Sequence, residues 1–113
     1  MRALSGRTAW RTWRGRSTAI GHLDVLAGAL RPMGYRCVAL YRADDLPVRP
    51  PLLWVFAFGP REHVRVAIGV QAVPGGWSYH EAGRGRLWTC DDAEGAAEQV
   101  DRLLKHRMFP ATW

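Results

Sequence analysis

Hydrophobic residues along the chain follow a helical spacing at both ends. Between residues 17 and 31 they recur every three or four positions, which predicts an amphipathic helix over 17–31. Pro32 and Gly34 follow and are residues that end helices. The same spacing returns over residues 92–107, and three basic residues stand in its last turn. The pattern therefore predicts one helix on each side of a central region.

Residues with side chains that cap helices stand at both predicted starts. Ser17 or Thr18 can accept the free amide hydrogens of the first helix. Asp91, with Glu94 three residues later, resembles a capping box for the second helix. Asp91, Asp92 and Glu94 also form a group of carboxylates of the kind used in acid–base catalysis. Their position at a helix start favours capping over catalysis.

The region between the helices predicts five β-strands. Its segments are rich in β-branched and aromatic residues, and residues 63–73 alternate between apolar and polar positions. Short connections containing proline or glycine separate them, which favours an antiparallel meander. The predicted strands are residues 35–42, 52–58, 63–73, 77–81 and 86–90.

The order of elements is therefore α-β-β-β-β-β-α. We expect a single α+β domain over residues 17–113, built as a two-layer sandwich. The five-stranded antiparallel meander forms one layer, and both helices cover one face of it. Residues 1–16 are expected to precede this domain as a basic, flexible tail rich in Arg and Trp.

The strand predicted at 52–58 is apolar on both of its faces. Strands of this kind are normally covered on both sides, but the two helices cover only one face of the sheet. The second face would be covered by a homodimer mate, by the N-terminal segment, by another partner or by the domain's own loops. We assign this partner-binding surface to Leu53, Val55 and Trp88.

Charge is concentrated at the start of the chain. The 113 residues have a net charge of +6, of which the five arginines in residues 1–16 contribute +5. Interleaved tryptophan and arginine side chains can stack on bases and pair with phosphates. The alternative function is therefore nucleic-acid binding through Arg7, Trp10, Arg11, Trp13, Arg14 and Arg16.

Neither metal binding nor catalysis is favoured by the motifs. His63, His80 and Glu81 are the candidate metal ligands, but consecutive strand residues such as His80 and Glu81 project to opposite faces. Cys37 and Cys90 form no CxxC motif and are expected to be buried, reduced thiols. We therefore expect no catalytic residue, no metal and no cofactor. A small enzyme of unknown reaction is the least favoured alternative.

The chain carries no targeting or membrane signal that we recognise. No run approaches the roughly 20 apolar residues that span a bilayer. The first residues lack the apolar core and cleavage site of a secretory signal. We therefore expect a cytoplasmic location without membrane contact.

Residues 18–106 resemble a group of small actinobacterial α+β proteins. The resemblance is carried by the segments LRPMGYR, PPLLWV and GWSYHEAGRGRLWTCDDAEGAAEQVDRLL, in which a Trp-rich hairpin precedes a D-D-x-x-x-A-A helix. No activity is established for that group, and some of its members accompany helix-turn-helix regulators. The resemblance implies a non-catalytic accessory or regulatory module. We expect it to act through protein–protein contact on the sheet face, with a homodimer as one arrangement.

Overall fold

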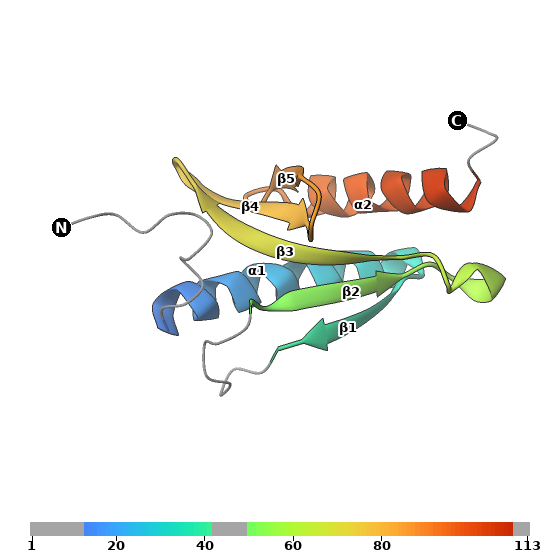
Figure 1. Ribbon diagram of the computed structural model, residues 1–113, viewed down its shortest axis with the longest axis horizontal. Coiled ribbons are helices and arrows are strands. Elements are labelled where there is room, and N and C mark those ends of the chain that lie inside the picture. Colours follow the sequence, from blue (N-terminus) through green and yellow to red (C-terminus); the bar gives the residue numbers. More distant parts are fainter. Residues whose placement is uncertain (1–12, 42–49, 110–113) are drawn as a thin grey trace.

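A computed structural model of the chain describes residues 13–41 and 50–109. It contains two α-helices, two single-turn 3₁₀-helices and five strands (Figure 1). The helices are α1 (Trp13–Leu30) and α2 (Ala93–Met108), and the 3₁₀ turns are η2 (Arg31–Met33) and η3 (Gly59–Arg61). The strands are β1 (Arg36–Leu40), β2 (Leu52–Phe56), β3 (Arg65–Val73), β4 (Gly76–Glu81) and β5 (Arg86–Thr89).

The strands form one antiparallel sheet in the order β1-β2-β3-β4-β5. Each strand pairs with its neighbour in the chain, so the sheet is a meander. Turns between strands depend on glycine at a few points: Gly75 and Gly83 have φ values of +85° and +77°, which favour a residue without a side chain. The predicted α+β fold and its element order are confirmed.

The two helices lie on the same side of the sheet and pack against each other. In Figure 1 the sheet lies in front of the helices, with α1 behind β2 and β3 and α2 beside β4 and β5. Apolar side chains from both layers meet there, including the fully buried Leu23, Ile68 and Leu104. Tyr79 is also fully buried, and its hydroxyl donates a 2.5 Å hydrogen bond to the His22 carbonyl oxygen of α1. The core thus joins the sheet to both helices.

Helix α1 begins four residues before the predicted start. Trp13 is its first residue, so Ser17 and Thr18 lie inside the helix and cap nothing. The Thr18 hydroxyl instead donates to the carbonyl oxygen of Arg14, one turn back. The helix ends at Leu30, one residue before the predicted end, and the chain then tightens into η2, which contains Pro32 and is followed by Gly34.

Helix α2 is capped by Asp92, one residue later than predicted. The Asp92 carboxylate accepts a 3.0 Å hydrogen bond from the backbone amide of Gly95. Glu94 lies in the first turn of the helix and Lys105 in the last, where their charges suit the helix dipole. The capping-box interpretation of Asp91 is therefore wrong, although the helix itself was placed correctly.

Candidate functional site

The strand register divides the side chains of the sheet between two faces. Residues directly opposite each other in an antiparallel pair project from the same face. Trp54 lies opposite Val38 on β1 and opposite Ala67 on β3. Leu53, its neighbour in the chain, lies opposite Ile68, and both are fully buried in the core beneath the helices. Trp54 therefore projects from the other face of the sheet, which we call the open face.

Apolar side chains of β1 and β2 form a band across the open face. Leu40 is 48% exposed and Val38 is 37% exposed, and their neighbours on β2 are half-buried. Neither α1 nor α2 covers this face (Figure 1). The band, which we call the apolar stripe, consists of Val38, Leu40, Leu52, Trp54 and Phe56.

Two arginines lie against the aromatic rings of the apolar stripe. The Arg65 guanidinium lies 5.2 Å from the ring centroid of Trp54, and the Arg36 guanidinium lies 4.6 Å from that of Phe56. The two rings are themselves neighbours, with centroids 6.2 Å apart. Arg36 also forms an ion pair with Glu62. Arginine and aromatic side chains in such arrangements attract each other by about 0.5–1 kcal/mol at exposed sites.

The assignment of Leu53 and Val55 to the partner-binding surface is wrong. Both are fully buried, opposite Ile68 and Val66 of β3, in the core beneath the helices. Strand β2 is apolar on both faces, as the sequence indicates, but the side chains that neither helix covers are Leu52, Trp54 and Phe56. The prediction assigned the two faces of the strand the wrong way round. Side chains alternate along a strand, so a shift of one residue exchanges the residues of the helix-covered face with those of the open face.

Trp88 is exposed but lies apart from the apolar stripe. It is 39% exposed on the edge strand β5, where it lies opposite Tyr79, a residue of the helix-facing side. Its indole Nε1 donates a 3.0 Å hydrogen bond to the Asp92 carboxylate. The hydrogen bond from the Gly95 amide, and then this one from Trp88, hold the pKa of Asp92 below its usual value. Trp88 thus links β5 to the start of α2.

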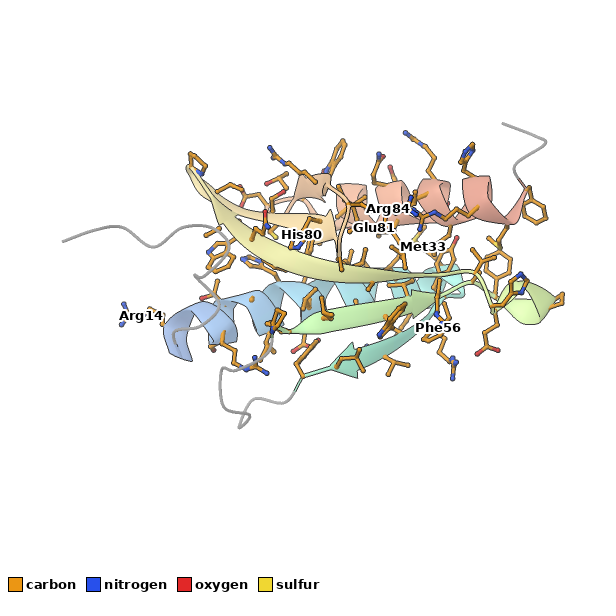
Figure 2. The ribbon with its side chains drawn as sticks, viewed as in Figure 1. Arg14, Met33, Phe56, His80, Glu81 and Arg84 are labelled. Carbon is orange, nitrogen blue, oxygen red and sulfur yellow. The ribbon has the colours of Figure 1, made fainter. Side chains whose placement is uncertain are left out.

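The residues of the alternative nucleic-acid site are only partly described. Arg7, Trp10 and Arg11 lie outside the residues that the structure describes. Of the others, Trp13 is the first residue of α1, and Figure 2 shows Arg14 projecting from that end of the molecule. The remaining member, Arg16, is 3% exposed in the second turn of α1. Its side chain is therefore enclosed by the domain and is not available to a phosphate.

The candidate metal ligands do not come together. His80 pairs with Gly69 of β3, whereas His63 lies in the turn before that strand, six residues from Gly69 along the chain. Glu81 projects towards α2, where its carboxylate accepts two 2.9 Å contacts from the Arg107 guanidinium. Within residues 13–41 and 50–109, no three His, Cys, Asp or Glu side chains are grouped as metal ligands.

Neither cysteine has the properties of a nucleophile. Cys90 is buried, and burial together with the nearby Asp91 carboxylate raises its pKa to about 12. Cys37 is half-buried, and burial raises its pKa as well, an effect that Arg31 partly opposes. Both are free thiols, and both stay protonated at neutral pH.

Comparisons with known proteins assign the chain to no family. Among the described residues, no helix is long and apolar enough to cross a bilayer. Searches against models of protein families, curated proteins and solved structures found no match. The similarity to actinobacterial proteins and the cytoplasmic location stay predictions from the sequence.

Proposed function

We propose that the chain is a non-catalytic binding module that associates with a second copy of itself through the apolar stripe. The observation that carries the proposal is the exposure of this stripe on a sheet face that neither helix covers. Sheets are stable in water with one polar face, and an apolar second face is the usual sign that another surface packs on it.

The arrangement of arginine and aromatic side chains supports protein contact over base stacking. A base stacks on the open face of a ring, but Arg65 lies over Trp54 and Arg36 over Phe56. Tryptophan and arginine are also enriched among the residues that dominate the binding energy of protein interfaces. The stripe therefore has the composition of an interface centre.

A second copy is the partner that matches the stripe most directly. Two stripes placed face to face put apolar side chains against apolar side chains. Among the described residues beside the stripe, Glu62 pairs with Arg36, while Arg65 lies against Trp54 without an ion pair. Residues of both signs thus lie at the rim, as in most interfaces.

The size of the stripe predicts a weak association. The stripe covers two strands of five residues, β1 and β2, which span about 10 Å by 17 Å, or about 170 Å² in projection. A stable dimer buries about 800 Å² of accessible surface on each partner. We therefore expect a dissociation constant in the micromolar range, about 10–500 μM.

Sedimentation equilibrium of the full chain tests the proposal. We expect a monomer–dimer equilibrium over about 10 μM to 1 mM. Trp54→Thr and Leu40→Thr, which keep a residue suited to a strand, should each raise the dissociation constant at least about tenfold. The matched control is Val25→Thr, because Val25 is 57% exposed on α1, away from the stripe.

Two results would overturn the proposal. One is a chain that remains monomeric throughout the concentration range. The other is a Val25→Thr variant that weakens the dimer as much as Trp54→Thr, because association would then use the helical layer. Circular dichroism of each variant separates loss of the dimer from loss of the fold.

A further inference from the structure

A cavity of about 690 Å³ lies at the other end of the open face from Arg36 and Arg65. Its floor includes Gly69 and Gln71 of β3 and His80 of β4. One wall is apolar and is formed by residues 50–52, and the opposite wall is the β4–β5 turn, residues 82–85. Cavities of about 300–1,000 Å³ are typical of small-molecule sites. The volume is therefore far larger than an inorganic ion needs.

The charged groups around this cavity favour an anion. Arg84 and Arg86 line it, and both are exposed to solvent. Arg86 forms no ion pair with any residue that the structure describes, and Arg84 only approaches Glu81 at 3.8 Å. The Glu81 carboxylate is already bound on both oxygens by Arg107. Among the described residues, the cavity is thus lined by two arginines, one without an ion pair and one in a long contact with Glu81, whose carboxylate also lines the cavity and is held by Arg107.

His80 provides an uncharged polar group in the floor. The absence of a side chain at Gly69 makes room for its ring: a Cβ there would lie 2.9 Å from Cε1 and 3.0 Å from Nε2. Burial lowers the pKa of His80, so the ring is neutral at pH 7. Its Nδ1 is buried and has no hydrogen-bond partner among the described residues. Such an atom is normally satisfied by water or by a ligand.

We propose that this cavity binds a small organic phosphate, with Arg84 and Arg86 pairing with the phosphate and the wall of residues 50–52 contacting the organic part. A phosphate monoester carries about −1.5 to −2 charges at pH 7, which balances the charge of two arginines. A ligand with one carboxylate would balance only one of them. Arginine also binds phosphate oxygens in pairs through its planar fork. This site shares only Leu52 with the apolar stripe, and Leu52 is not substituted in the test of self-association.

Adenosine monophosphate is the probe for this site. We expect it to shift the His80 imidazole Cε1–H resonance saturably, with a dissociation constant below about 1 mM. The Arg84→Gln/Arg86→Gln double variant should weaken binding at least about tenfold. Arg102→Gln is the matched control, because Arg102 is exposed on α2 in the other layer. Gly69→Ala should also weaken binding, since its methyl group displaces the His80 ring.

Further arms distinguish the phosphate from the rest of the ligand. Adenosine without a phosphate should not bind, and inorganic phosphate should bind more weakly than the nucleotide because it leaves the apolar wall empty. The assignment is overturned if no saturable shift is seen, or if Arg102→Gln weakens binding as much as the double variant. It is also overturned if a short single-stranded oligonucleotide binds more tightly than the mononucleotide, because the ligand would then be a nucleic acid.

Discussion

At the scale of single residues, the position of the His80 ring depends on the absence of a side chain at Gly69. The ring of His80 occupies the space that any side chain at position 69 would take. Burial of that ring disfavours its protonated form and lowers its pKa. The sequence alone does not show what lies next to a histidine in a strand. The pairing of β3 with β4 places His80 opposite Gly69.

The lowered pKa of His80 predicts that stability falls at mildly acidic pH. Above pH 6.5 the ring is neutral in both the folded and the unfolded chain, and its contribution is fully present. Below that value the unfolded chain takes up the proton first, so stability falls until the lower pKa of the folded state is passed. His22 adds in the same direction, because burial lowers its pKa too.

Urea unfolding at pH 7.5 and pH 5.5 measures this loss. We expect His80→Gln to lose less stability than the unchanged chain between the two pH values, with His22 contributing to the loss that remains. His63→Gln is the control, because His63 is exposed in the turn before β3. Equal losses in the His80→Gln variant and in the unchanged chain would contradict the prediction.

At the scale of elements, Asp92 joins two parts of the fold through one carboxylate. One oxygen caps α2 at Gly95, and the other accepts the indole hydrogen of Trp88 on β5. Sequence reasoning found the helix and the capping function but chose Asp91. A sequence pattern does not distinguish Asp91 from Asp92 as the capping residue. Which of the two caps the helix depends on where the chain leaves β5.

Substitution of Asp92 should therefore destabilise the protein more than substitution of Asp91. We expect Asp92→Ala to lower the midpoint of thermal unfolding and Asp91→Ala to lower it less. Asp92→Asn should restore the part of the loss that comes from the cap, because asparagine caps helices about as well as aspartate, but not the part that comes from Trp88, because the asparagine NH2 group cannot accept the indole hydrogen. Differential scanning calorimetry of the three variants measures the order. Equal midpoints for the two alanine variants would contradict the assigned cap.

The helices and strands could be predicted because their sequence patterns are local. Which residues of β2 lie on the open face could not be predicted in this way. Alternation along residues 63–73 correctly places Val66 and Ile68 on one face, which lies in the core. Which face of β2 joins them depends on the register across the β2–β3 connection, where Leu53 lies opposite Ile68. One residue more or less in that connection would have exchanged Leu53 and Trp54. The early start of α1 was missed for a related reason: Arg16 is polar in the sequence but buried in the structure.

At the scale of the whole molecule, positive charge collects on the open side of the sheet. Arg36, Arg65, Arg84 and Arg86 lie on or beside this face, and among the described residues Glu62 pairs with Arg36 and Glu81 approaches Arg84 at 3.8 Å. Self-association through the face brings these like charges nearer, whereas binding of a phosphate neutralises two of them. The two proposed contacts should therefore respond to salt in opposite directions.

Added salt should strengthen the dimer and weaken nucleotide binding. Screening at about 0.5 M salt reduces both the repulsion between two open faces and the attraction of the arginines for phosphate. Sedimentation and calorimetric titration at low and high salt measure the two dissociation constants. A dimer that weakens with salt would indicate attraction between opposite charges and contradict packing of two open faces.

The most direct measurement of the central claim is a mixed-label NMR experiment on the full chain. One half of the sample carries ¹³C on its methyl groups and the other half is unlabelled, so only contacts between two copies are recorded. We expect intermolecular NOEs from the methyl groups of Val38, Leu40 and Leu52 to aromatic protons of Trp54 and Phe56 in the other copy. Intermolecular NOEs that arise instead from Val25 of α1, or none at millimolar concentration, would contradict the claim that the open face is the site of association.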